Sequence, residues 1–272
     1  MFECVVNVSE GRRNEILDLL ARAAGPSLRD RHADPFHNRS VYTLIDERDA
    51  LCANVRALAA ATFEQLDLRE HVGVHPRFGV LDVVPYVALD PGRAGEAVAL
   101  RDETARWVAT TFEVPAFLYG PLADGTERGL PEVRRRAFTA LAPDVGPAQP
   151  SARLGACAVG ARGVLVAWNL WVRGISLDEG RAVARALRRR EVRALAFSIP
   201  PWTQISVNLV EPEVVGPAIV YDQVVGLVPP GAVERAELVG LVPASVLRAS
   251  ARDRWEQLGL SDGQTIEARL AR

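Results

Sequence analysis

The sequence predicts an α/β (α+β) protein built from two similar halves, and three observations support this. Strand and helix patterns follow the order βαββαβ over residues 3–87. The same order returns over residues 164–241. The stretch between them, residues 142–155, is rich in Pro, Gly and Ala, which is typical of a loop. We therefore expect two subdomains, residues 1–163 and 164–272.

In the first half, apolar β-prone runs alternate with segments whose apolar residues recur at helical spacing. The predicted elements are strand 3–8, helix 13–24, strands 27–32 and 40–45, helix 48–66 and strand 80–87. Three further elements are predicted, namely helix 94–112, strand 116–119 and helix 126–140. Strand 80–87 is apolar almost throughout, which indicates a strand buried on both faces.

The second half has the same pattern. Its predicted elements are strand 164–172, helix 177–190, strands 192–199 and 204–210, helix 214–226 and strand 232–241. The split βαββαβ order is that of a ferredoxin-like unit, whose first and third strands are neighbours in the centre of the sheet. We predict two such units with added helices, whose facing sheets form a double layer.

Composition excludes several classes of function. A net charge of −2 offers no basic face for nucleic acid. All 32 basic residues are arginine, so Schiff-base chemistry and a P-loop lysine are excluded. Anions must then be bound by guanidinium groups or by backbone N–H groups.

The sequence also predicts where the protein is found. No apolar run approaches the roughly 20 residues that a bilayer span needs. The N-terminus lacks the basic start of a signal peptide, and three widely spaced cysteines indicate neither a disulfide framework nor a zinc site. We therefore expect a cytoplasmic protein that binds no membrane.

Histidines mark the most informative segment of the chain. Four are present, namely His32, His37, His71 and His75. A zinc pair at 71 and 75 would favour a helix, but Gly73 and Pro76 argue against one, and no third ligand stands at a usual spacing. A hydrogen-bonded histidine in a turn is an alternative. A general acid/base at the mouth of a buried strand, with Arg77 nearby, is the interpretation that the pattern favours.

Three segments carry a family resemblance. They are ECVVNVSEGR at 3–12, DPFHNRSV at 34–41 and HVGVHPRFGVLDVVP at 71–85, with weaker matches at 114–120, 155–162 and 239–243. Together they resemble the formiminotransferase domain of glutamate formiminotransferases, over nearly the whole chain and in order. The resemblance implies two facing ferredoxin-like subdomains, a homodimer, and transfer of a formimino group from N-formimino-L-glutamate to tetrahydrofolate. It places the protein in one-carbon metabolism and histidine degradation, with folate as co-substrate and no metal.

The resemblance also assigns residues. It places the catalytic histidine at His75, which is expected to accept the proton of folate N5 and to return it to the departing amine of glutamate. It places folate binding on the stretch Gly146, Pro147, Ala148, Gln149, Pro150, Ser151, Ala152, Arg153, Leu154 and Gly155. By charge and position, the candidates for binding the substrate carboxylates or amidine are Arg39, Arg77, Arg162, Asn7, Asn38 and His37. For the three arginines the alternative is an exposed or ion-paired residue without a role in binding. For the two asparagines it is a role in a backbone turn, which is favoured for Asn38.

Some positions differ from the family pattern. Relatives usually carry a basic residue and then Glu or Gln where this chain has Val72 and Val74, and a common Trp is replaced within residues 151–154. The region 188–201 also lacks a longer insert. Val72 and Val74 motivate one alternative, a one-carbon transferase with a different amine substrate. Two further alternatives stay open: a folate-binding paralogue without catalysis, and transfer of formyl in place of formimino.

Overall fold

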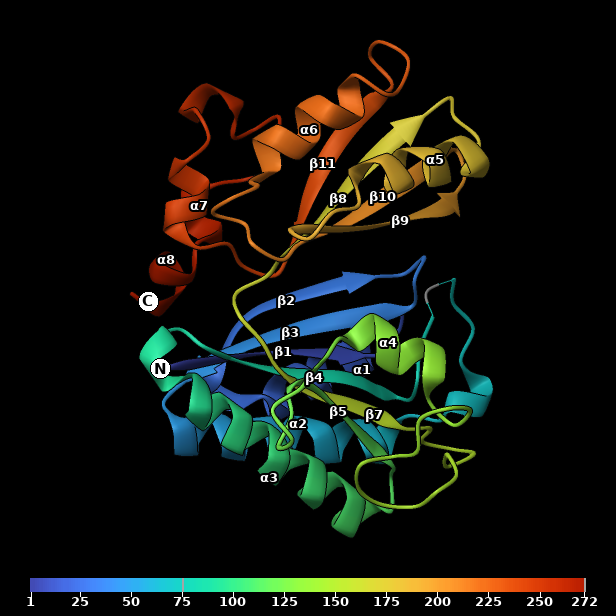
Figure 1. Ribbon diagram of the computed structural model, residues 1–272, viewed down its shortest axis with the longest axis vertical. Coiled ribbons are helices and arrows are strands. Elements are labelled where there is room, and N and C mark those ends of the chain that lie inside the picture. Colours follow the sequence, from blue (N-terminus) through green and yellow to red (C-terminus); the bar gives the residue numbers. More distant parts are fainter. Residues whose placement is uncertain (75, 272) are drawn as a thin grey trace. The chain divides into compact units, whose positions relative to one another are not determined.

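Two sheets, one of seven strands and one of four, organise the chain (Figure 1). The computed structural model describes residues 1–74 and 76–271. Its two units are Met1–Arg162 and Gly163–Arg272, each with its own sheet and its own core, and each is described by itself. The predicted mixed α/β class with two sheets is confirmed. That the two sheets face each other stays a prediction.

The first unit holds the seven-stranded sheet. Its strands are β1 (Phe2–Val8), β2 (Leu28–Asp34), β3 (Arg39–Asp46), β4 (Leu81–Ala88), β5 (Ala116–Pro121), β6 (Glu127–Arg128) and β7 (Cys157–Ala161). Its helices are α1 (Asn14–Ala23), α2 (Arg48–Gln65), α3 (Ala94–Phe112) and α4 (Leu130–Arg136), with short 3-10 turns at Gly25–Ser27, Leu68–Glu70 and Pro91–Arg93. The strand order is β2-β3-β1-β4-β7-β5-β6. As expected, the first and third strands are neighbours, and β1 pairs antiparallel with both β3 and β4.

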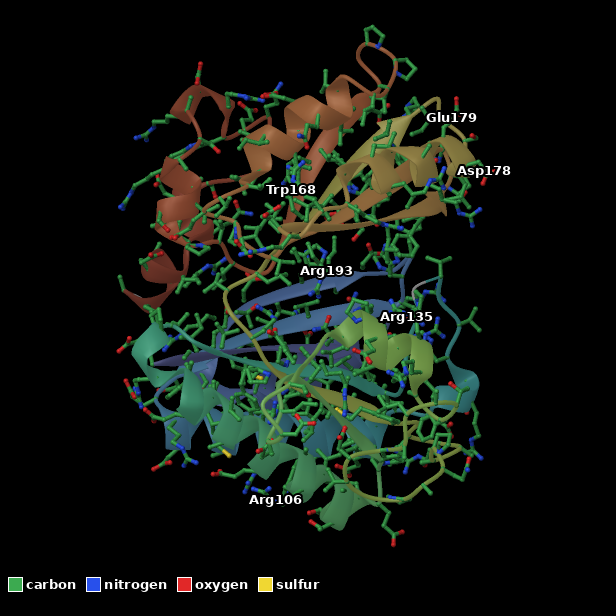
Figure 2. All side chains as sticks on the ribbon, viewed as in Figure 1. Arg106, Arg135, Trp168, Asp178, Glu179 and Arg193 are labelled. Carbon is green, nitrogen blue, oxygen red and sulfur yellow. The ribbon has the colours of Figure 1, made fainter. Side chains whose placement is uncertain are left out.

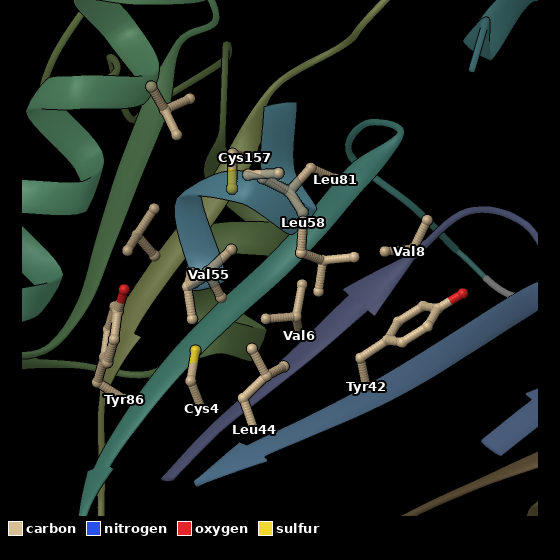
Figure 3. Close-up of a cluster of buried hydrophobic side chains, with 14 of the residues drawn as sticks. Cys4, Val6, Val8, Tyr42, Leu44, Val55, Leu58, Leu81, Tyr86 and Cys157 are labelled. Atoms are coloured by element: carbon tan, nitrogen blue, oxygen red, sulfur yellow. The ribbon is translucent and has the colours of Figure 1, made fainter. Parts of the chain in front are cut away.

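Successive side chains of β1 point to opposite faces of this sheet, so they show which face is covered by which helices. Phe2, Cys4, Val6 and Val8 are fully buried in a cluster with residues of α2 and α3, part of which Figure 3 shows. The intervening residues, such as Glu3 and Asn7, therefore belong to the opposite face. Helix α4 packs on that opposite face, because its Val133 clusters with side chains of β4, β5 and β7.

Two details of the first unit differ from the sequence prediction. The helix expected over 126–140 is wrong at both ends. Residues 127–128 form β6, and α4 begins only at Leu130, after an extended Gly129 and with a proline in its first turn. It ends at Arg136 because Ala137 leaves the helical conformation. Strand β7 was not expected. Its residues Cys157–Ala161 are small, with little strand propensity, yet all are buried because β7 lies between β4 and β5 and is parallel to both.

The second unit holds the four-stranded sheet. Its strands are β8 (Val166–Arg173), β9 (Val192–Ile199), β10 (Trp202–Leu209) and β11 (Val233–Val239). Its helices are α5 (Leu177–Leu187), α6 (Pro217–Val225), α7 (Ala244–Arg248) and α8 (Ile266–Leu270), with 3-10 turns at Arg252–Arg254 and Asp262–Gln264. The order β11-β8-β10-β9 is antiparallel throughout and repeats the arrangement β4-β1-β3-β2 of the first unit.

Local signals account for this second unit. Helix α5 begins with a capping box in which Ser176 and Glu179 bond each other's backbone. Trp168 of β8 is fully buried in the core and donates from Nε1 to the carbonyl of Leu258 at 2.8 Å (Figure 2).

Across the described residues of both units, no helix is long and apolar enough to cross a membrane.

Candidate active site

Three segments that are far apart in the sequence meet at one end of the seven-stranded sheet. They are the end of β1, the turn before β3 and the loop of residues 71–80 before β4, which we call the loop. Ser9 donates from Oγ to the carbonyl of Gly79 at 2.8 Å and from its backbone N–H to the carbonyl of Val80 at 2.8 Å. The backbone N–H of Gly11 donates to Asn38 Oδ1 at 2.9 Å. These are the three segments that carried the family resemblance.

Asn38 joins the turn to the loop. Its φ of 49° lies in the left-handed region, which asparagine tolerates better than most residues. Its Nδ2 donates to the carbonyl of Val72 at 3.0 Å. The loop approaches so closely that a Cβ on Gly73 would lie 2.3 Å from the carbonyl oxygen of His37, so only glycine fits there. Asn38 thus anchors a backbone turn, which was the alternative role considered for it.

The predicted catalytic residue, His75, lies outside the described residues. Its neighbours show what kind of surface surrounds the loop. Val72 is 71% exposed and Val74 is 53% exposed, although both side chains are apolar. Pro76 is exposed as well. The loop therefore presents apolar side chains to solvent on both sides of position 75.

His71 and Arg77 hold this loop in shape. His71 donates from Nε2 to the carbonyl of Asn38 at 2.8 Å, which makes Nδ1 the acceptor of a neutral ring. Burial lowers the pKa of His71 and so favours that neutral form. Arg77 donates from Nη1 to the carbonyl of His71 at 3.4 Å and from Nη2 to the carbonyl of Gly73. The guanidinium of Arg77 thus closes the loop on itself.

Beside the loop lies a cluster of three charged side chains and one amide, which we call the Asp82 cluster: Asn7, Arg39, Asp82 and Arg134. Arg39 donates from Nε and Nη2 to Asn7 Oδ1 at 3.1 and 2.7 Å, and from Nη1 to Asp82 Oδ2 at 2.5 Å. Arg134 donates from Nη2 to the same Asp82 oxygen at 2.7 Å. The Asp82 carboxylate is fully buried, yet the two guanidinium groups hold its pKa well below its usual range.

A β-bulge explains how Asp82 reaches this position. On β1, Val8 pairs with Leu81 and Asn7 pairs with Val83, so Asp82 is an extra residue on β4. Its Oδ1 accepts from the backbone N–H of Phe78 at 2.6 Å. Asp82 and Arg134 were not among the residues predicted from the sequence. The available signal was a single carboxylate inside an otherwise apolar strand.

The remaining substrate-binding candidates are not gathered in one place. His37 is buried, with Nε2 3.8 Å from Asp34 Oδ2. Arg162 follows β7, and its backbone N–H donates to the carbonyl of Tyr86 near the other end of β4. The structure therefore brings Asn7, Asn38, Arg39 and Arg77 together and leaves Arg162 at the far end of the sheet.

The end of the predicted folate stretch, residues 146–155, adjoins the same loop. Gly155 forms an antiparallel bridge with Gly79, and the carbonyl of Leu154 accepts from Val80 N–H at 3.0 Å. Gly155 has a φ of 75°, and a Cβ on it would lie 2.2 Å from the Phe78 carbonyl oxygen. Arg153 donates from Nη2 to the carbonyls of Phe63 and Glu64 at 3.0 and 2.8 Å. These carbonyl groups at the C-terminal end of α2 thus have a hydrogen-bond donor that the helix itself does not supply.

Metal ligands are not clustered in the described part of the chain. There, no group of three or more His, Cys, Asp and Glu side chains is placed to hold an ion. The polar groups near the loop are instead guanidinium and amide groups. Their chemistry suits the binding of carboxylates and of planar nitrogen groups.

Comparison with known proteins adds to this geometry. The model of a family described as formiminotransferase domain, N-terminal subdomain, matches residues 1–162. A glutamate formimidoyltransferase of Thermoplasma acidophilum is 31% identical over 300 residues, covering 99% of this chain and 97% of that protein. A glutamate formimidoyltransferase of Streptococcus pyogenes is 32% identical, over 68% of this chain and 67% of its own length. The formimidoyltransferase-cyclodeaminase of Sus scrofa is 31% identical over 91% of this chain, which spans 51% of that longer relative.

Proposed function

This chain belongs to the formiminotransferase family and is a transferase of the formimino group, and we propose that it moves this group from N-formimino-L-glutamate to tetrahydrofolate. The observation that carries the proposal is the convergence of the three family segments on the loop around position 75, beside the guanidinium groups of Arg39 and Arg77. A site of this kind suits an anionic substrate.

The proposed reaction transfers one carbon between two nitrogens. Folate N5 attacks the amidine carbon of the donor, and His75 accepts the N5 proton as the new N–C bond forms. The bond between the amidine carbon and the glutamate nitrogen then breaks, and His75 returns the proton to that departing nitrogen. An imidazole, with an ordinary pKa near 6.5, suits both steps near neutral pH.

We also propose a folate site, an oligomeric state and a cellular role for this protein. Folate would bind along residues 146–155, whose last residues adjoin the loop. We also propose a cytoplasmic homodimer that acts in histidine degradation. Size-exclusion chromatography with light scattering tests the dimer, for which the expected mass is twice 29.5 kDa.

The experiment that tests catalysis measures glutamate release from N-formimino-L-glutamate in the presence of tetrahydrofolate. We expect turnover by the wild type and a loss of about 100- to 10,000-fold in kcat for His75→Ala, with folate binding retained. His32→Gln, a histidine of β2 outside the loop, is the control and should keep its activity. Full activity in His75→Ala would disprove the acid/base role, and tight folate binding without any transfer by the wild type would favour a non-catalytic paralogue.

A second candidate function is formimino transfer from a different amine. The exposed Val72 and Val74 favour it, because apolar side chains flank position 75 in the sequence. A panel of formimino amino acids with acidic, amide and apolar side chains distinguishes the two. Preference for an apolar donor would establish this second candidate.

A further inference from the structure

Three guanidinium groups interact with the single carboxylate of the Asp82 cluster. A single carboxylate accepts from two guanidinium groups, those of Arg39 and Arg134, and the guanidinium of Arg77 is close enough to interact with Asp82 electrostatically. Charges in a partly buried site interact strongly, so guanidinium groups there attract an anion more strongly than they would on an open surface. The cluster is therefore suited to receiving a further anion.

The two arginines bonded to Asp82 differ in how many donors they have already used. Arg39 has all three nitrogens engaged, two on Asn7 and one on Asp82. Arg134 uses Nη2 for Asp82, while its Nη1 makes only a long contact of 3.3 Å with the carbonyl of Pro76. Among the described residues, no acceptor bonds its Nε–H. Arg134 therefore keeps donors that a ligand can use.

Position also favours Arg134. Its guanidinium lies over the ring of Phe78, 5.2 Å from the centroid, and its side chain is 21% exposed. Its Nη1 contact is with Pro76, the residue that follows His75 directly. The hydrogen bond to Asp82 and the contact with the Phe78 ring fix the orientation of the guanidinium before any ligand arrives, and such preorganisation lowers the entropic cost of binding.

We propose that Arg134 binds a carboxylate of the donor amino acid and so determines the specificity of the site for an acidic substrate. This inference rests on the proposed function, because it assigns a residue to the donor of that reaction. Arg39 then acts as a positioning residue that keeps Asp82 charged. The carboxylate specificity comes from α4, an element that the family resemblance did not point to.

The test compares Arg134→Gln with Arg135→Gln, an exposed neighbour on the same helix that Figure 2 labels. Donors are N-formimino-L-glutamate and its two carboxamide analogues, each lacking one carboxylate. For Arg134→Gln we expect kcat/KM with the acidic donor to fall about 10- to 100-fold, as for a lost charge-assisted hydrogen bond. With one of the two carboxamides, wild type and Arg134→Gln should differ by less than about threefold. Arg135→Gln should match the wild type throughout.

The outcomes that would overturn or support the proposal are as follows. Equal loss with every donor would show a merely structural role and overturn the proposal, as would an unchanged preference for the acidic donor. If Arg134→Gln does not fold, Arg134→Lys keeps a cation beside Asp82 without the planar fork, and the same selective loss is expected at smaller size. Calorimetric titration with glutamate needs no turnover, so binding that depends on Arg134 in an enzyme inactive on these donors supports this inference while the proposed function fails. Absence of glutamate binding by the wild type overturns it.

Discussion

Two buried carboxylates on one face of the seven-stranded sheet behave in opposite ways. Asp82 and Glu3 belong to the neighbouring strands β4 and β1, separated by four residues along β1, or about 13 Å. Both are almost fully buried. The pKa of Asp82 lies well below its usual range, whereas burial raises the pKa of Glu3 from 4.5 to about 7.

The partners of each carboxylate explain the difference. Asp82 accepts hydrogen bonds from two guanidinium groups and from a backbone N–H, all of which favour its charged form. For Glu3, burial is the largest influence and disfavours charge, and the more remote guanidinium of Arg162 offsets it only in part. Burial alone therefore does not decide the charge state. Directly bonded cations at the end of the sheet beside the loop keep Asp82 ionised there.

The largest effect is expected from Asp82→Asn. This change leaves two guanidinium groups at a buried site without their carboxylate, and breaking a buried pair in this way costs about 3–5 kcal/mol. Urea unfolding at pH 7 measures the loss. Asp18→Asn is the matched control, because the ion pair of Asp18 with Arg31 is half exposed and should contribute less than about 1 kcal/mol. Similar small losses in both variants would contradict our view of the Asp82 cluster.

The pH dependence of Asp82 has a definite sign. In the folded state the pKa of Asp82 is depressed below the ordinary value of 3.8. Its contribution to the free energy of unfolding is therefore fully present above pH 3.8 and is lost as the pH falls further. The advantage of the wild type over Asp82→Asn should therefore be constant from pH 5 to 8 and shrink in stronger acid.

Glu3→Gln should change the free energy of unfolding in the opposite direction to Asp82→Asn. The folded pKa of Glu3, about 7, lies above its ordinary value of 4.5, so ionisation penalises the folded state as the pH rises through that window. The glutamine variant avoids the penalty. We expect it to be more stable than the wild type at pH 8, by about 3 kcal/mol at most. The difference should vanish below about pH 4.5, and urea unfolding across this pH range checks it. A variant less stable than the wild type at pH 8 would contradict the prediction.

Comparison of these sites with the sequence shows what local patterns can predict. The helices and strands with clear periodicity were predicted, among them β1, β4 and α3, and so were the glycine-rich and proline-rich segments that form the loop. Patterns of this kind depend on neighbours in the chain. Strand β7 was missed because its small residues become a strand only between β4 and β5.

The candidate site was predicted only in part for the same reason. Arg39 and Arg77 were selected from the sequence because each stands in one of the distinctive segments, 34–41 and 71–85. Asp82 enters the site through a bulge that depends on pairing with β1, and Arg134 joins it from α4, 52 residues further along the chain. Neither contact can be predicted from neighbours in the chain, although Asp82 is a single carboxylate inside an apolar strand. Arg162 is the opposite case. It stands in a segment that resembles the family, yet it lies at the other end of the sheet from the loop.

The smallest predicted effect concerns Arg162 and tests whether Glu3 has the partner that the comparison assigns to it. Removing the cation in Arg162→Gln should raise the pKa of Glu3 further, because Arg162 is the influence that lowers it. At pH 8 the variant should lose about 1 kcal/mol or less of its free energy of unfolding. In a Glu3→Gln background the same change should cost less, since the carboxylate it stabilises is gone, and urea unfolding of all four proteins measures this coupling. An identical cost in both backgrounds would mean that Arg162 acts through its other contacts, and that nothing at this end of the sheet resembles the charge pairing around Asp82.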